Sequence, residues 1–214
     1  MHPFFPVFRL TGLLLVVAFG VALPARAADP LRTLVFFGDS LTAGYGLDDP
    51  STESYPARIQ EKISAGGLRW RVVNAGLSGE TTAGGLRRVD WILRQPVDVF
   101  VLALGANDGL RGVDPALSQK NLEGILARVR AKYPQAKLVL AGMQMPPSMG
   151  ADYATKFTAV FAEVAKQYDA TLIPFLLDQV GGVAELNQSD QIHPNVRGHQ
   201  HVAETVWAVL KPLL

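Results

Sequence analysis

The sequence predicts an α/β fold in which one parallel β-sheet is covered by helices on both faces. Short, continuous apolar runs recur at 33–37, 70–73, 97–104, 138–141 and 171–173. Such runs are typical of strands that are buried on both faces. Segments with helical spacing of apolar residues lie between them, and this regular alternation predicts parallel strands joined by crossover helices.

The predicted helices carry start signals or apolar stripes. Ser54 precedes a helix that begins at Tyr55 and Pro56, and Asp114 precedes one that begins at Pro115. The second helix has an apolar stripe of Leu122, Ile125, Leu126 and Val129. Further helices are expected over 81–94, 153–168 and 196–210. No repeat, low-complexity stretch or linker interrupts residues 28–214, so we expect a single domain there.

Residues 1–27 have the pattern of a secretory signal peptide. Arg9 precedes a charge-free apolar run over 10–23, and the small-residue site Ala25-Arg26-Ala27 follows. We expect export and cleavage after Ala27. An uncleaved membrane anchor is the alternative, but about 14 apolar residues fall short of the ~20 that span a bilayer. We therefore expect no stable membrane span after cleavage.

Composition excludes several classes of function. The chain has 214 residues, of which 49% are hydrophobic and 18% charged, so it can bury a sizeable core. Without residues 1–27, 18 basic and 19 acidic residues leave a net charge of −1. Nucleic acid is therefore not an expected partner, because phosphate backbones require clustered positive charge. The chain has no cysteine, which excludes disulfides and thiol nucleophiles.

Four polar segments are expected to meet at one edge of the sheet. Three of them, 38–41, 74–76 and 105–108, follow the first three apolar runs, and the fourth, 190–194, precedes the last helix. Ligands of open parallel sheets bind outside the carboxyl ends of the strands. The sequence therefore predicts a site built from these four segments.

Ser40, His193 and Asp190 are the candidate catalytic residues. A serine hydroxyl becomes a good nucleophile only when a neighbouring base takes its proton, and histidine is the usual base near neutral pH. Asp190 stands three residues before His193, so we expect the two on one side of a helical turn. The carboxylate would fix the imidazole tautomer and leave the other ring nitrogen facing Ser40.

Acyl transfer also needs hydrogen-bond donors for the oxyanion that develops in the transition state. Gly76 can offer a backbone N–H, Asn107 a side-chain amide, and Ser40 its own N–H. These three groups are the expected oxyanion hole.

Simpler interpretations remain open for the same residues. Ser40 could be only a helix N-cap, Asn107 part of a plain turn, and Asp190 a helix cap. Asp39 and Asp108 are expected to order loops, because neither has an evident partner that raises its pKa.

Other polar residues have structural interpretations. His199 and His201 are expected to be ordinary residues of the last helix. Arg87, Arg88 and Arg94 are expected on a solvated helix face.

Several known site patterns are missing from the sequence. A Gly-x-Ser-x-Gly elbow would require glycine at Thr42, and neither a phosphate-binding loop nor a His-Glu-x-x-His pattern occurs. No metal or other cofactor is expected.

The four segments resemble the sequence blocks of the GDSL, or SGNH, hydrolases. The resemblance rests on Gly38-Asp39-Ser40-Leu41, Gly76, Gly105-Ala106-Asn107-Asp108 and Asp190-Gln191-Ile192-His193-Pro194, and also on 107–112 and 143–147. It runs from about Leu34 to the C-terminus and departs at Ala106, where many members have glycine.

The resemblance implies a flavodoxin-like three-layer α/β/α sandwich with a five-stranded parallel sheet. It also implies a Ser40, Asp190 and His193 triad with an oxyanion hole at Ser40, Gly76 and Asn107. The implied activity is hydrolysis of acyl esters and thioesters by a periplasmic enzyme.

Apolar residues beside the expected site suggest the substrate. Leu77, Leu110, Met145 and Pro146 are expected to line an acyl groove, together with Met143 and Pro147. The alternative for the methionines is that they fill gaps in the core. We expect a monomer whose partner is a small-molecule acyl ester or thioester.

Two other functions are left open. A carbohydrate O-acetylesterase of the same fold would require aromatic stacking platforms, for which only Tyr45 and Tyr55 are near. An exported, non-catalytic binding module is the alternative from another class.

Overall fold

The computed structural model describes residues 1–4 and 30–214 of the chain. Five strands form one parallel sheet in the order β2-β1-β3-β4-β5. The strands are β1 (Arg32–Gly38), β2 (Trp70–Gly76), β3 (Val99–Ala103), β4 (Lys137–Ala141) and β5 (Thr171–Ile173). The five apolar runs and their parallel pairing are thus confirmed. Residues 5–29, which include most of the expected signal peptide and its cleavage site, lie outside the described residues.

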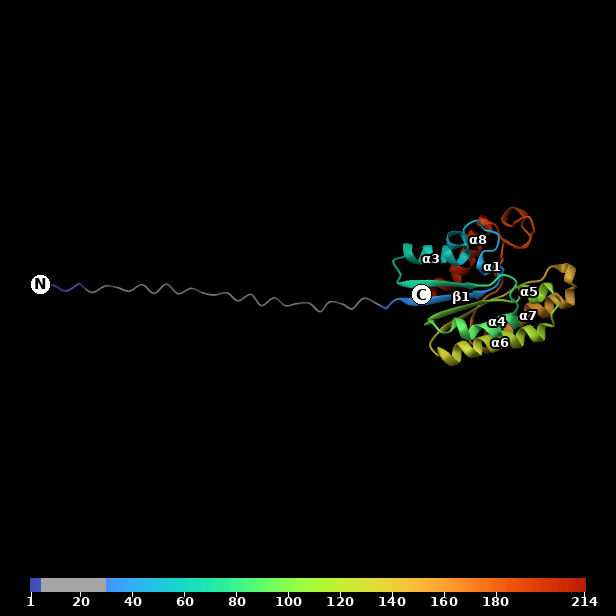
Figure 1. The fold of residues 1–214 in the computed structure, drawn as a ribbon, viewed down its shortest axis with the longest axis horizontal. Coiled ribbons are helices and arrows are strands. Elements are labelled where there is room, and N and C mark those ends of the chain that lie inside the picture. The colour runs from blue at the N-terminus through green and yellow to red at the C-terminus, as the bar shows by residue number, and fades with distance from the viewer. Residues whose placement is uncertain (5–29) are drawn as a thin grey trace.

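Helices cover both faces of the sheet (Figure 1). On one side, α3 packs on β2 and against α8; on the other, α4 and α6 pack together and α7 packs on β4 and β5. Their bounds are α3 (Tyr55–Ala65), α4 (Thr82–Ile92), α6 (Pro115–Lys132), α7 (Ala151–Gln167) and α8 (Val196–Leu210). The three-layer α/β/α architecture and all five predicted helices are confirmed.

The central strands form the middle of the core. The residues of β1 from Leu34 to Phe37 and those of β3 from Val99 to Leu102 are completely buried. Phe36 packs edge-on against Tyr55 of α3, with the ring centroids 5.4 Å apart. Burial on both faces explains why these strands are continuously apolar rather than alternating.

Three short α-helices of the described residues were not predicted: α1 (Ser40–Ala43), α2 (Pro50–Glu53) and α5 (Ala106–Leu110). Each has only one turn or slightly more, too short for an apolar period to appear in the sequence. The side chains of Asp39 and Asp49 cap α1 and α2 by accepting from the backbone two residues further on. Because α1 and α5 begin where β1 and β3 end, they set the edge of the sheet that carries the polar segments.

Among residues 1–4 and 30–214, no helix combines the length and the apolar character required to cross a bilayer.

Candidate active site

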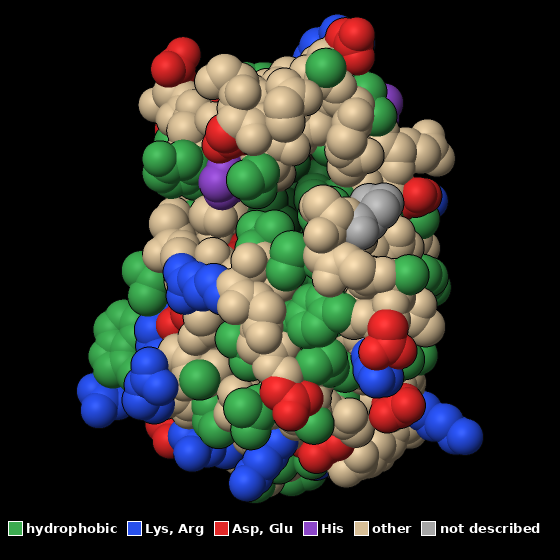
Figure 2. Space-filling model, turned by 90° about the vertical axis from the view of Figure 1, so that its right-hand side faces the viewer, with side chains coloured by type: hydrophobic (Ala, Val, Ile, Leu, Met, Phe, Trp, Pro, Cys, Tyr) green, Lys and Arg blue, Asp and Glu red, His purple; other side chains and the backbone are tan. Residues whose placement is uncertain are grey.

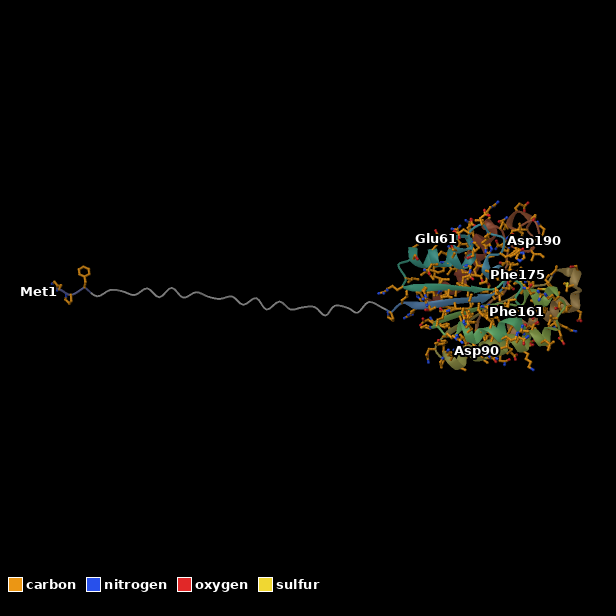
Figure 3. The ribbon with its side chains drawn as sticks, in the orientation of Figure 1. Met1, Glu61, Asp90, Phe161, Phe175 and Asp190 are labelled. Atoms are coloured by element: carbon orange, nitrogen blue, oxygen red, sulfur yellow. The ribbon has the colours of Figure 1, made fainter. Side chains whose placement is uncertain are left out.

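Ser40, His193 and Asp190 form one hydrogen-bonded chain. Ser40 is the first residue of α1, and its Oγ lies 2.9 Å from Nε2 of His193. On the other side of the imidazole ring, Nδ1 of His193 lies 2.7 Å from Oδ2 of Asp190. Figure 3 labels Asp190 at the end of the molecule where the strands finish. Parallel strand ends and the loop before α8 thus bring together side chains separated by 153 residues.

The loop of Asp190 differs from the expected helical turn. Oδ1 of Asp190 accepts from the backbone N–H groups of Ile192 (2.9 Å) and His193 (3.0 Å), while Gln191 has a left-handed φ of 59°. Asp side chains form such local bonds readily, and here these bonds replace those of a helix. The pairing was predicted correctly, but the turn that produces it was not.

The carboxylate of Asp190 is strongly favoured over the carboxylic acid. Burial acts to raise its pKa, but bonds from the backbone and ring of His193 and from the backbone of Ile192 outweigh burial. The pKa of Asp190 falls to about 2. An ionised carboxylate can only accept hydrogen bonds, so Nδ1 of His193 donates. In a neutral imidazole Nε2 then accepts, and the Ser40 hydroxyl is its donor.

Gln188 holds the histidine loop, and sequence reasoning missed it. Its backbone N–H donates to the carbonyl of His193 (2.7 Å), and its side-chain amide donates to the carbonyls of Tyr45 (2.7 Å) and Pro194 (3.0 Å). The ring of Tyr45 lies 4.8 Å from that of His193. No local pattern could have indicated Gln188, because Tyr45 is 143 residues away in sequence.

Gly76 does not offer a free N–H, in contrast to the prediction. Its N–H donates to Oδ1 of Asn74 (3.0 Å), and a Cβ at Gly76 would clash with the backbone of Ala43. Glycine is therefore needed here because β2 passes very close to α1, not to supply an oxyanion donor.

Gly79 is the better candidate for a backbone donor. Its φ is +79°, a conformation that favours glycine, and a Cβ there would meet open space. No described residue accepts its N–H. The next carbonyl, of Glu80, accepts from Nδ2 of Asn107 (3.1 Å), so the Asn107 amide lies against this loop. Gly76 and Gly79 stand three residues apart after the second strand, and nothing in the sequence distinguished one from the other as the donor.

A buried ion pair anchors the same loop, and it corrects the prediction for Arg88. Arg88 is not on a solvated face: its Nε donates to both carboxylate oxygens of Glu80 (2.9 and 3.1 Å) and its Nη2 to the carbonyl of Ala75 (2.9 Å). The guanidinium lies 4.3 Å from the ring centroid of Phe37. Glu80 is 7% exposed. Arg87 and Arg94 are exposed, as expected.

Asp108 orders loops, as expected. Its carboxylate accepts from the backbone N–H (2.8 Å) and the hydroxyl (2.6 Å) of Thr82, which ties α5 to the start of α4.

Asp39 caps α1 but also titrates, which the sequence did not predict. Oδ1 accepts from the backbone of Leu41 (3.0 Å), whereas Oδ2 is buried without a partner among the described residues. Burial is the main cause that raises the pKa of Asp39 to about 7, and the carboxylates of Asp108 and Glu80 add to it.

His199 is a residue of α8, as expected, and it lies in the core. It is 1% exposed, and its Nδ1 accepts from the backbone N–H of Tyr55 (3.2 Å). Burial lowers its pKa to about 4, so it is neutral near pH 7. His201 is exposed on α8. In the described part of the chain, no three His, Asp or Glu side chains are grouped to hold a metal ion.

The predicted groove residues divide into exposed and buried ones. Leu77, Leu110 and Pro146 are exposed, whereas Met145 is 8% exposed and lies against Gly109. Met143 is also buried in the core. The two methionines therefore fill gaps in the core, and they do not line an exposed groove. Figure 2 shows hydrophobic side chains in and around a hollow beside a histidine on this face.

The fold and the site define an ester hydrolase of the α/β class. A model of the GDSL-like lipase/acylhydrolase family matches residues 36–201. The chain belongs to this family.

Relatives extend over most of the chain. The esterase TesA of Pseudomonas aeruginosa is 42% identical over 184 residues, which cover 86% of this chain and 90% of TesA. Thioesterase 1/protease 1/lysophospholipase L1 of Escherichia coli is 36% identical and covers 89% of this chain and 87% of its own. Among solved structures, the esterase EstA of Pseudoalteromonas sp., inhibited by monoethylphosphonate, superposes with a TM-score of 0.79. It is 32% identical and covers 85% of this chain and 98% of EstA. The chain is an esterase of this family.

The raised pKa of Asp39 predicts a specific pH dependence of stability. The folded protein keeps this proton up to about pH 7, whereas the unfolded chain loses it near pH 3.8. The stabilising contribution of Asp39 to the free energy of unfolding is therefore fully present below pH 3.8. It is lost as pH rises toward 7, by about 1.4 kcal/mol per pH unit. Asp39→Asn should remove this slope. Urea unfolding of both proteins at several values between pH 4.5 and 7 measures it; a constant difference in unfolding free energy would contradict the prediction.

The Glu80–Arg88 pair should stabilise the fold more than a surface pair. Glu80→Gln leaves the largely buried guanidinium without its counter-charge and should lower the unfolding free energy by roughly 1.5–3 kcal/mol. Asp90→Asn is the matched control, because Asp90 pairs with Arg128 on the surface and should cost less than about 1 kcal/mol. Equal losses in the two variants, measured by urea unfolding at one pH, would refute the distinction.

Proposed function

We propose that this esterase hydrolyses carboxylic esters and thioesters of acyl chains through Ser40, His193 and Asp190. The observation that carries the proposal is the continuous hydrogen-bonded chain from the Ser40 hydroxyl through the imidazole to the carboxylate. Nucleophile, base and orienting acid are thus within direct contact distance.

The reaction begins when the Ser40 Oγ attacks the carbonyl carbon and Nε2 of His193 takes its proton. The tetrahedral intermediate collapses, and the imidazolium returns the proton to the departing alcohol or thiol. Water, activated by the same imidazole, then attacks the acyl-enzyme and releases the acid and Ser40. Asp190 stabilises the imidazolium and remains ionised throughout, in keeping with its pKa of about 2. Protonation of the resting imidazole would remove the base, so activity falls at acid pH.

We assign the oxyanion hole to the N–H groups of Ser40 and Gly79 and the amide of Asn107. No described residue accepts the N–H of Ser40 or that of Gly79. One proton of the Asn107 amide donates to the carbonyl of Glu80, which fixes the orientation of the amide and leaves its second proton for the substrate.

The acyl chain would lie against two exposed apolar residues, Leu110 at the end of α5 and Pro146 in the segment that follows β4. The relatives are called esterase and thioesterase, which supports the same bond types here. A carbohydrate acetylesterase is less well supported. Tyr55 is fully buried, with its hydroxyl bonded to that of Thr42, so only Tyr45 of the two candidate aromatics is exposed.

The proposed site of action is the periplasm. The basic residue, apolar run and Ala25-Arg26-Ala27 site of residues 1–27 support export and cleavage after Ala27. Chemical sequencing of the N-terminus of protein from a periplasmic extract would test this, with Ala28 expected first.

Activity should depend on Ser40 and His193 far more than on other residues of the same type. A fluorophosphonate should label the wild type at Ser40 and not label Ser40→Ala. His193→Ala should lower kcat on p-nitrophenyl butyrate by several orders of magnitude, by comparison with other triads. His201→Ala, which changes an exposed histidine on α8, is the control and should leave kcat unchanged.

Two results would contradict the catalytic proposal. Equal labelling of wild type and Ser40→Ala would exclude Ser40 as the nucleophile and leave the non-catalytic module open. A loss below tenfold in His193→Ala would mean that another base is used.

Acyl-chain preference should distinguish the two substrate classes. If the exposed leucine at 110 contacts the chain, kcat/KM for p-nitrophenyl octanoate should exceed that for acetate. Leu110→Ser should reduce the octanoate value by about tenfold with little change for acetate, because it removes apolar contact worth roughly 1–2 kcal/mol. A sharp preference for acetate in the wild type would instead support the acetylesterase.

A further inference from the structure

The loop that carries Gly79 also forms part of the wall of a surface pocket. This pocket has a volume of about 520 Å³ and is formed by residues 77–81, Gly84 and the arginines Arg87, Arg88 and Arg111. The proposed mechanism uses the N–H of Gly79 in this loop but none of these three guanidinium groups. Arg111 lies within the segment 107–112, on which the family resemblance partly rests, but the resemblance implies no role for it.

The pocket is strongly positive for a protein that is nearly neutral. Glu80 is the one acidic residue of its described wall, and Arg88 neutralises it. Arg87 and Arg111 are exposed, and no carboxylate of the described residues lies within ion-pair distance of either. The pocket therefore has a net charge of about +2, whereas residues 28–214 together have −1. Two free guanidinium groups at one pocket indicate an anionic ligand.

The pocket adjoins the proposed oxyanion hole. Nη2 of Arg111 donates to the carbonyl of Gly79 (3.3 Å), and the neighbouring Glu80 carbonyl accepts from the Asn107 amide. A substrate whose carbonyl oxygen accepts from the N–H of Gly79 would therefore lie close to Arg111, which contacts the carbonyl of the same residue. Figure 2 shows Lys or Arg side chains on the same face as the histidine and the apolar hollow.

We propose that this pocket binds the phosphate of a phosphate-bearing leaving group. Guanidinium groups present planar pairs of N–H donors that match phosphate oxygens, and they remain charged at every relevant pH. The proposal rests on the proposed ester and thioester hydrolysis. It divides the substrate into an acyl chain on the apolar side of the scissile bond and an anionic leaving group held by Arg87 and Arg111. The shared chemistry fits both a lysophospholipid headgroup and the phosphates of coenzyme A.

The kinetic test uses substrate pairs that share an octanoyl chain and differ in phosphate. One arm compares 1-octanoylglycerol 3-phosphate with 1-octanoylglycerol, and the other compares octanoyl-CoA with S-octanoylpantetheine. In Arg87→Ala we expect KM for the phosphate-bearing member to rise about five- to tenfold, and KM for the neutral member to change less than about twofold. Arg111→Ala also removes the contact with the Gly79 carbonyl, which can change KM for every substrate. For this variant the informative quantity is therefore the ratio of KM for the phosphate-bearing substrate to KM for the neutral one.

Arg94→Ala is the matched control. Arg94 is an exposed arginine just beyond the far end of α4, and its loss removes the same charge outside the pocket. It should leave both KM values unchanged. A raised ratio in the glycerophosphate pair alone assigns the pocket to a lipid headgroup, and one in the thioester pair alone assigns it to coenzyme A.

Direct binding separates this proposal from the proposed function. Inorganic pyrophosphate titrated into the full chain by calorimetry should bind saturably, and the Arg87→Ala, Arg111→Ala double variant should lose this binding. The proposal that this pocket binds phosphate would be wrong if pyrophosphate did not bind saturably to the wild type. It would also be wrong if Arg87→Ala changed KM equally for phosphate-bearing and neutral substrates. If the wild type hydrolyses none of the four substrates, the proposed function fails, while the pyrophosphate titration still decides whether the pocket binds phosphate.

Discussion

The hydrogen bond between the Ser40 hydroxyl and the His193 imidazole is the contact on which the functional interpretation depends. It joins the end of the first strand to the loop before the last helix, so it exists only when the whole sheet is assembled. The two partners are fixed in different ways. Ser40 follows a buried strand and starts a helix capped by Asp39, whereas His193 is held by Asp190 and by the backbone of Gln188. The Ser40 hydroxyl and the imidazole are therefore already in contact in the structure, as the proposed mechanism requires.

The loop over residues 77–81 has an equally demanding position. It must present a backbone N–H at Gly79 and a carbonyl at Glu80 for Asn107, yet it has no regular secondary structure of its own. The Glu80–Arg88 pair supplies the missing rigidity by linking the loop to α4, to the end of β2 and to the ring of Phe37. Burying an ion pair costs desolvation, which the bidentate geometry and the bond to the Ala75 carbonyl offset. The Glu80–Arg88 ion pair thus holds the loop whose Gly79 N–H and neighbouring Asn107 amide we assign to the oxyanion hole.

Charged groups around the site have two separate functions. Asp190 is ionised because its carboxylate accepts several hydrogen bonds, whereas Asp39, only one residue from Ser40, is largely deprived of solvent and partners and holds its proton to about pH 7. Arg88 is paired with Glu80, whereas Arg87, at the preceding position of α4, has no carboxylate partner among the described residues. Neighbouring residues of one type are thus used differently: Arg88 holds a loop of the fold, whereas Arg87 is the one that we propose to bind a ligand.

The strands and the long helices could be predicted from the sequence because they depend on local periodicity. The three residues that we propose to be catalytic could be predicted because polar segments follow buried strands or precede the last helix. Ser40 and Asn107 could be found from their places after buried strands, and His193 from its place before the last helix and its spacing to Asp190. The likeness to a known family pointed to the same positions. Tertiary structure alone decided which glycine has a free N–H, that Arg88 turns inward, and that Gln188 anchors the histidine loop. Each of these outcomes depends on a partner far away in sequence, such as Ala43 beside Gly76 or Tyr45 beside Gln188. Hydrogen bonds and burial of that kind leave no periodic trace in the chain, so they become visible only when the distant segments are packed together.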